Sequence, residues 1–147
     1  MLWVPYHRWL EAQVDGSLSN TPIDFDGDTL KIALAKAAYT PDTAAHEYWA
    51  DAQAQEVGPA GNYTAGGETL AHKTVTLSVG TVTFDNTMDL TWVQSGTGFA
   101  DARYAVLYKE GASAAASPLI AYADLGGNRG NLAGDLTLQF DGLITWS

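Results

Sequence analysis

The stretch Ala102-Arg-Tyr-Ala-Val-Leu-Tyr108 decides the fold. It is rich in Tyr and Val and contains neither Gly nor Pro, which is typical of a β-strand. Because successive side chains of a strand point to opposite faces, Tyr104 and Tyr108 share one face, and Arg103 and Leu107 share the other. Apolar side chains on both faces predict a central strand that is covered on each side. We interpret Arg103 as a structural residue paired with a carboxylate or loop carbonyls, with binding of a substrate carboxylate as the alternative.

Alternating apolar and polar residues predict further strands along most of the chain. They lie at residues 29–34, 74–79, 81–84, 89–93, 119–124, 136–140 and 143–146. The first of these reads as a half-buried strand. Val75, Leu77 and Val79 are expected to point inward, and the change of phase after Gly80 marks a turn or bulge.

Turn signals separate these strands and complete the fold prediction. Gly126–Asn131 is expected to be a loop, and Asp141-Gly142 is a strong hairpin signal. About eight short strands with glycine-rich turns predict a mainly β chain, an antiparallel β-sandwich or flattened barrel with one or two short helices. We expect residues 1–147 to form a single β-sandwich domain.

Two segments have helical spacing. In residues 1–15, spacings of three and four place four apolar side chains on one face: Trp3, Tyr6, Leu10 and Val14. Pro5 suits the first turn of this helix, and Gly16 suits its end. The second helix is expected to have Thr40 as its N-cap and to continue through Ala44–Ala54.

The aromatic side chains of residues 1–15 allow two interpretations. The segment is either a short helix that covers the core or a docking arm that binds a neighbouring subunit, because Trp and Tyr are frequent binding hot spots. The candidate partner-binding residues under the second interpretation are Trp3, Tyr6, Trp9 and, in the glycine-rich segment 56–70, Tyr63.

The composition argues against several classes of function. The chain has 147 residues, which suits one domain, and seven Lys and Arg against 17 Asp and Glu give a net charge of −10. Phosphate backbones and anionic lipids repel such a chain, so we expect neither nucleic acid nor a membrane as a partner. The absence of cysteine excludes disulfides and thiol chemistry. We also expect no secretory signal, and no apolar run approaches the roughly 20 residues that span a bilayer.

No residue pattern indicates catalysis or a metal site. Neither HExxH spacing nor a Gly-x-Ser-x-Gly motif is present, and the histidines lie far apart: His7, His46 and His72. Asp24–Asp28 superficially resembles a calcium loop, but Thr29 and Ala35 stand where Gly and Glu are needed. The acidic residues that strands could bring together for glycoside hydrolysis are Glu56, Glu68 and Asp85. We expect no enzyme, no metal and no cofactor.

One ordered set of phrases runs through most of the chain. It comprises Asp28–Leu34, Tyr39–Asp42 with His46, Glu56-Val57, Gly61–Leu70, Leu90–Trp92, Ala102–Tyr108, Ser117–Tyr122 and Asp141–Ile144. Together these phrases resemble a group of tailed-bacteriophage virion structural proteins, some of which resemble head decoration, or cement, proteins. The resemblance covers about residues 28–146. Met1–Val14 departs from the shorter starts of that group.

The resemblance implies a structural role without catalytic residues. It points to a capsid decoration (minor capsid) protein that binds the outside of a phage head and stabilises contacts between capsid subunits. The implied partners are the major capsid protein and copies of the chain itself, and the implied location is the virion. A tail-tube or tail-terminator component is the alternative. A carbohydrate-binding virion module is a further alternative, with an aromatic platform made by Trp49, Trp92 and Trp146.

Overall fold

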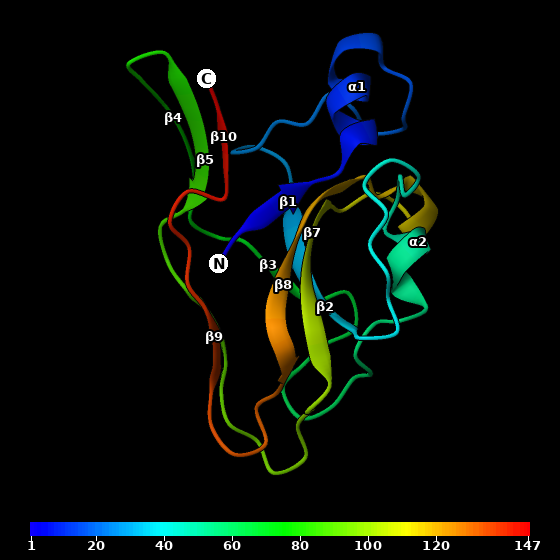
Figure 1. Cartoon of the computed structure of the whole chain (residues 1–147), viewed down its shortest axis with the longest axis vertical. Coiled ribbons are helices and arrows are strands. Elements are labelled where there is room, and N and C mark those ends of the chain that lie inside the picture. Colours follow the sequence, from blue (N-terminus) through cyan, green and yellow to red (C-terminus); the bar gives the residue numbers. More distant parts are fainter.

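The fold is seen in a computed structural model that covers all 147 residues, Met1–Ser147. The elements, shown in Figure 1, are β1 (Trp3–Pro5), α1 (His7–Asp15), β2 (Leu30–Lys36), α2 (Ala50–Gln53), β3 (Glu68–Thr69), β4 (Lys73–Ser78), β5 (Thr81–Asn86), β6 (Leu90–Trp92), β7 (Ala102–Lys109), the 3-10 turn η1 (Ala114–Ala116), β8 (Leu119–Arg129), β9 (Leu136–Leu138) and β10 (Ile144–Trp146). Every strand pair is antiparallel. The predicted fold class, mainly β with antiparallel sheets and short helices, is confirmed.

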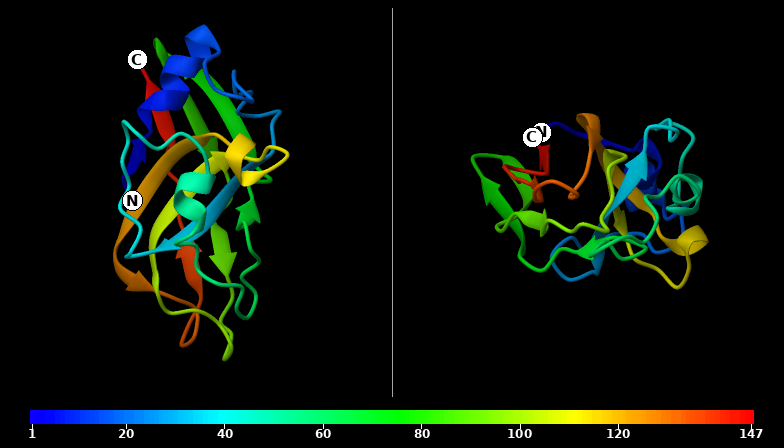
Figure 2. Two further views of the ribbon diagram at one scale, coloured as in Figure 1. Left: turned by 90° about the vertical axis from the view of Figure 1, so that its right-hand side faces the viewer. Right: turned by 90° about the horizontal axis from the view of Figure 1, so that it is seen from below.

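Two groups of strands lie on opposite sides of the molecule, as Figure 2 shows. One is a five-stranded sheet in the order β1-β8-β7-β2-β3, and the other combines the sheet β10-β5-β4 with the pair β6-β9. The second group keeps one register throughout. Leu90 lies six residues after Phe84, and its partner Leu138 lies six residues before Ile144, the partner of Phe84. β5 with β6, and β9 with β10, therefore act as two long, interrupted strands of one layer.

β7 lies at the centre of the five-stranded sheet, between β2 and β8. Its neighbouring residues Val106 and Leu107 point to opposite faces, and neither has any exposed surface. On one face the ring of Tyr108 stacks on Trp49, with centroids 5.0 Å apart and planes inclined by 4°. The prediction of a central strand covered on both sides is therefore confirmed.

Two strands of this sheet are more extensively covered or paired than the sequence predicts. β2 is not half-buried, because Ala33 and Ala35 on one face are covered as fully as Leu34 on the other. β8 continues through the glycines that predict a loop and ends only at Arg129. Arg129 pairs with Ala102 after a register shift, so the ladder with β7 resumes beyond the irregular stretch.

The first helix starts later than predicted. Pro5 belongs to β1 on the edge of the sheet, where a residue without a backbone N–H is tolerated. Gly16 ends α1 as predicted, with a left-handed φ of 68°. The predicted face is only partly buried: Tyr6 is buried and Leu10 packs against the core, but Val14 is 92% exposed. Within α1 the buried residues are Trp9 and Ala12.

The second helix is much shorter than predicted and covers only Ala50–Gln53. Thr40 does not cap it. Instead, the Oδ1 atom of Asp42 accepts hydrogen bonds from the backbone N–H groups of Ala44 and Ala45, each 3.0 Å long. This local turn competes with the first turns of a helix, as Asp side chains commonly do.

Asp141-Gly142 is not the turn of a hairpin. It lies between β9 and β10, which follow one another along the same layer and pair with β6 and β5, respectively. Gly142 has a φ of 73°, so this glycine allows a bend within a long strand rather than a chain reversal. A single hydrophobic cluster of 31 buried residues joins both layers with α1 and α2.

Candidate partner-binding surface

The four aromatic residues that the sequence suggests as partner anchors are covered by the chain itself. Trp3, Tyr6, Trp9 and Tyr63 are each no more than 8% exposed. Side chains that already fill the chain's own core are not available to a partner, so their prediction as docking anchors is wrong for the folded chain. Of the two interpretations of residues 1–15, the structure supports a helix and strand that cover the core.

Trp9 shows how α1 contributes to the core. Its indole N–H donates a 2.6 Å hydrogen bond to the carbonyl of Ile120 in β8. Its ring packs edge-on against Phe25 and Trp146, with centroid distances of 5.5 and 6.3 Å. Phe25 also contacts Phe84, so residues from α1, a loop, β5 and β10 form one aromatic cluster. The cluster closes one end of the space between the layers.

The two buried tyrosines of this set form internal hydrogen bonds. The Tyr6 hydroxyl lies 2.6 Å from the Tyr39 hydroxyl, which in turn lies 3.0 Å from Nδ1 of His46. The Tyr63 hydroxyl accepts the Leu34 N–H and donates to Glu56 over 2.7 Å. These networks are structural rather than exposed binding groups.

Burial also controls the acidity of these hydroxyls. It raises the pKa of Tyr39 to about 12 and the pKa values of Tyr6, Tyr63 and Tyr108 well above the usual phenol range. All four side chains therefore stay protonated and neutral at physiological pH.

The proposed sugar platform is not formed. Trp49 is buried against Tyr108, and Trp92 is buried near Tyr63 and Phe99. Only Trp146 keeps part of its surface exposed. Sugar platforms need exposed aromatic faces, so this arrangement contradicts the expectation of a carbohydrate-binding surface at these three residues.

The charged residues that stood out in the sequence have structural partners. Arg103 forms a bidentate ion pair with Asp124 across β7 and β8, with N–O distances of 2.7 and 2.8 Å, as its structural interpretation predicts. The side-chain hydrogen bonds raise the pKa of Arg103 and lower the pKa of Asp124. Glu56 accepts hydrogen bonds from the Tyr63 hydroxyl and the Gly66 N–H. These contacts orient loops and strands.

The acidic loop before β2 uses its carboxylates for turn formation. Oδ1 of Asp24 accepts the N–H of Gly27 over 3.1 Å, and Oδ2 of Asp28 accepts the N–H of Asp24 over 2.8 Å. Asp28 also pairs with Lys109 at 2.9 Å. No group of three His, Asp or Glu side chains is arranged to hold a metal ion.

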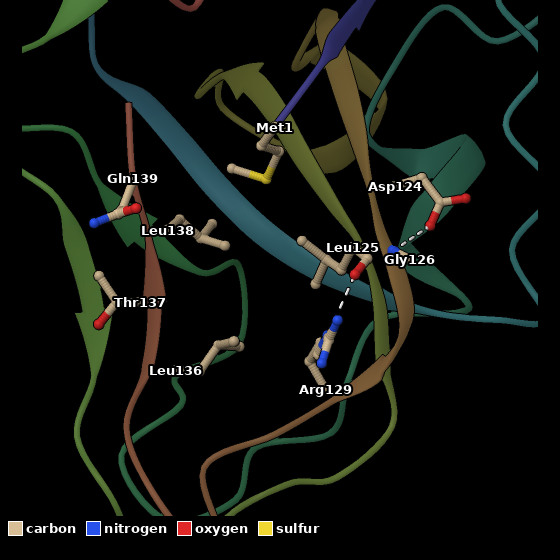
Figure 3. A pocket seen from close by; sticks show the side chains of 9 residues that line it. All are labelled: Met1, Asp124, Leu125, Gly126, Arg129, Leu136, Thr137, Leu138 and Gln139. Carbon is tan, nitrogen blue, oxygen red and sulfur yellow. Dashed lines mark hydrogen bonds between the residues drawn. The ribbon is translucent and has the colours of Figure 1, made fainter. Parts of the chain in front are cut away.

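A cleft of about 370 Å³ lies between β8 and β9, where the two layers do not pair with each other. Figure 3 shows Leu125, Leu136, Leu138 and Met1 around it, with Arg129 on one side. The Arg129 Nε atom donates a 3.3 Å hydrogen bond to the carbonyl of Leu125. The cleft contains neither a nucleophile paired with a base nor a pair of carboxylates, so it does not indicate catalysis.

The hairpin of β4 and β5 exposes three large apolar side chains within five residues. Val75 is 43% exposed, Leu77 is 73% exposed and Val79 is fully exposed. The sequence pattern predicts that these three side chains are buried in the core, and that prediction is wrong. We call these three residues, together with the outer edge of β4, the hairpin surface.

The direction of the β4 side chains agrees with the sequence pattern although their burial does not. Val75 lies opposite Phe84, and Leu77 lies opposite Val82, so these four side chains share one face of the sheet. Phe84 is fully buried on that face. Figure 1 shows the hairpin extending past the end of the five-stranded sheet. The apolar face thus continues beyond the layer that covers it.

The tip of the hairpin has an unusual backbone conformation. Val79 and Gly80 form a two-residue turn in which both have positive φ, 48° and 76°. A turn of this kind matches the twist of the flanking strands, but its first position favours Asn or Asp. A β-branched residue in this conformation is strained, and Val79 also exposes its whole side chain. Such strain is often found at functional positions.

β4 is also an unpaired edge without charges along most of its length. It pairs with β5 on one side and with nothing on the other. Residues 74–84 contain no charged side chain, although the chain as a whole has a net charge of −10. Natural edge strands usually carry a charge, a proline or a bulge that prevents association. Apart from Lys73 at its start, β4 lacks these features, and the hairpin surface is the candidate partner-binding surface.

Comparisons with known proteins found no matching family model, no matching curated protein and no matching solved structure. None of the helices has the length and apolar character needed to cross a bilayer. The functional argument therefore rests on the sequence and on the geometry of this chain.

Proposed function

We propose that the chain is a structural virion protein that decorates the outside of a tailed-phage head. The observation that carries this proposal is the hairpin surface, an exposed apolar edge on a chain in which the four aromatic residues suggested as anchors are buried and Arg103 is paired with Asp124. An apolar patch of this kind on a β-sandwich fits protein binding better than chemistry. The phage-like phrases in residues 28–146 supply the proposed setting.

The proposed mechanism is mechanical. Each copy buries the exposed parts of Val75, Leu77 and Val79 against the major capsid protein or a neighbouring copy. Burial of apolar surface contributes about 25 cal/mol per Å², so one small contact is weak. Many copies on one head act together, because a copy or cluster held at one contact meets the next at high effective concentration. The shell then resists expansion by the packaged genome.

The charge distribution fits a position on the outer surface. The net charge of −10 repels DNA, whereas the uncharged residues 74–84 allow close approach of another protein. Binding through an apolar surface of this kind is expected to depend only weakly on salt, because it lacks the paired charges that salt screens.

Purified protein added to heads that lack it tests the proposal. Wild type is expected to bind to a fixed number of positions per head. Because burial of a leucine side chain contributes about 1.5–3 kcal/mol, Leu77→Lys is expected to weaken binding about tenfold or more. The matched control is Val14→Lys, which places the same charge on the exposed face of α1. Equal binding by all three proteins contradicts a role for the hairpin surface.

Location in the virion is tested separately by labelling the protein in intact particles and imaging them at low resolution. Label distributed over the head supports decoration. Label confined to the tail overturns it in favour of a tail-tube or tail-terminator component. The unpaired edge of β4 is the observation that favours this second candidate, because rings of tail subunits can form through sheet edges.

A further inference from the structure

We propose that the outer edge of β4 pairs with β4 of a second copy of this chain. The two strands run antiparallel across a two-fold axis at Val75, and each copy extends the other's β10-β5-β4 sheet. This inference rests on the proposed function only in treating the hairpin surface as an interface. It identifies the partner at the strand edge as the chain itself.

The geometry of the hairpin defines which backbone groups are free. Ser78 and Thr81 flank a two-residue turn, so they form the closing pair that exchanges both backbone hydrogen bonds. Along an antiparallel ladder such pairs alternate, which makes Thr76 the next bonded residue of β4. The N–H and C=O groups of Val75 and Leu77 therefore point outward.

No other part of the chain uses this edge. Outside the ladder with β5, no backbone hydrogen bond involves residues 73–78. The only side-chain hydrogen bond from this strand is donated by Lys73 to the carbonyl of Asp28. The edge thus presents free donors and acceptors in the regular spacing that another strand requires.

The charge distribution permits a second copy to approach along this edge. Two copies that each carry a net charge of −10 repel one another over most of their surfaces. They can approach closely where charge is absent, and the run at residues 74–84 is uncharged. Its alternation of Thr and Val suits both faces of an extended sheet.

The register that we infer is self-complementary. With the two-fold axis at Val75, each Val75 lies opposite its counterpart, Thr74 lies opposite the partner's Thr76, and Lys73 lies opposite the partner's Leu77. Lys73 also directs its backbone N–H and C=O groups outward by the same alternation, so all three outward-facing residues of β4 are then paired. Paired Thr side chains on one face and paired Val side chains on the other are both favourable cross-strand combinations.

Pairing in this register also joins the two hairpin surfaces. Val75 and Leu77 of both copies lie on one face next to Val82 and Phe84, and Lys73 borders this apolar strip at each end. The dimer thereby offers a larger apolar surface than either copy alone. A contact limited to one strand edge is small, so we expect association in the micromolar range or weaker.

A single introduced cysteine tests the register directly, because the natural chain contains none. Opposite residues in a hydrogen-bonded pair have Cα atoms about 5.5 Å apart, which lies within the range that a disulfide spans. Val75→Cys is therefore expected to form disulfide-linked dimers rapidly under mild oxidation. Val14→Cys, on the exposed face of α1, is the control. Cross-linking of Val75→Cys no faster than that of the control overturns the register.

A charge exchange at the same position tests the proposal without covalent chemistry. Wild type is expected to show concentration-dependent dimers by sedimentation velocity. Val75→Lys and Val75→Glu, each alone, place like charges opposite one another and should weaken association about tenfold or more. An equimolar mixture of the two variants should restore dimers. Unchanged melting temperatures of both variants verify that they are folded.

The outcomes separate this inference from the proposed function. Monomeric wild type at every concentration, or a mixture that associates no better than either variant, overturns the β4 pairing. Specific binding to heads by a protein that never dimerises leaves decoration standing and removes the inference. Dimers that form as described but do not bind heads leave the pairing standing and remove decoration.

Discussion

β7 and β4 are both strands of antiparallel sheets, but they have opposite environments. Apolar side chains occupy both faces of β7, whereas in β4 Val75 and Leu77 alternate with Thr and Ser. β7 has a neighbour on each side and cover on each face, so Val106 and Leu107 are fully buried. β4 has one neighbour and extends past the opposite layer, so Leu77 is 73% exposed. Alternation determines where a side chain points, whereas distant parts of the chain determine whether anything covers it.

The same substitution should have very different effects in the two strands. Leu107→Ala removes a fully buried side chain and is expected to lower the free energy of unfolding by about 2–5 kcal/mol. Leu77→Ala removes a mostly exposed side chain and should change it by no more than about 0.5 kcal/mol. Urea unfolding at pH 7 measures both values. Losses of similar size would show that β4 is covered in solution.

Alkaline pH should act on the tyrosines around the five-stranded sheet and not on β4, which has none. Burial raises the pKa of Tyr6 far above its ordinary value of 10.0, so the folded chain holds a proton that the unfolded chain releases. This contribution to stability is complete below pH 10 and is lost at higher pH, by about 1.4 kcal/mol per pH unit. Burial also raises the pKa values of Tyr39, Tyr63 and Tyr108, so these side chains likewise cause stability to fall as the pH rises above 10.

Tyr6→Phe isolates one of these contributions. Between pH 10 and pH 11.5, approximately, the slope of the free energy of unfolding against pH should become shallower by about 1.4 kcal/mol per unit than in wild type. Urea titrations at several pH values in this range measure the slope. The variant also loses the hydrogen bond to Tyr39, which lowers stability at all pH values. Identical slopes would contradict a buried, protonated Tyr6.

A residue suited to positive φ at the tip of the β4–β5 hairpin should stabilise the folded chain. Val79→Asn should raise the free energy of unfolding by about 1 kcal/mol, because Asn adopts the left-handed region far more readily than Val. Val14→Asn in α1 is a matched exposed control, and helix propensities of Val and Asn are similar. Thermal or urea unfolding measures both variants. A loss of stability in Val79→Asn would show that Val79 packs against something.

The smallest expected effect concerns the exposed ion pair of Arg103 and Asp124. Hydrogen bonds from Arg103 lower the pKa of Asp124 below its ordinary value of 3.8. The pair therefore stabilises the folded chain above about that pH, and its contribution disappears as the pH falls through the lower folded-state value. Asp124→Asn should cause a minor loss at pH 7 and none at pH 2. A variant equally destabilised at both pH values would indicate a packing role instead.

Several parts of the fold follow from local sequence. The Tyr- and Val-rich stretch 102–108 predicts the central strand, Gly16 predicts the end of α1, and Arg103 predicts a paired arginine. Each depends on the residue itself or on immediate neighbours. Strand propensity, the preference of glycine for left-handed φ and the need of a charged side chain for a partner can all be read from a short segment alone.

Other features depend on contacts between distant segments and could not be predicted in this way. Asp42 forms a turn where Thr40 and Pro41 suggest a helix, and the pairing of β9 with β6 makes Asp141-Gly142 a bend. The candidate surface has the same origin. The sequence of residues 73–86 predicts its strands and its turn at Gly80, but its exposure results from how far the opposite layer extends.

The pairing of β1 with β8 has a consequence for synthesis on the ribosome. Trp3 lies opposite Ala123, so β1 cannot find its partner until β8 has been made. The β4–β5 hairpin, closed by a two-residue turn, can form as soon as it emerges. The apolar edge that we propose for self-pairing therefore belongs to the first tight β-hairpin that a growing chain exposes. Neighbouring chains on one messenger could meet through it before either has completed its core.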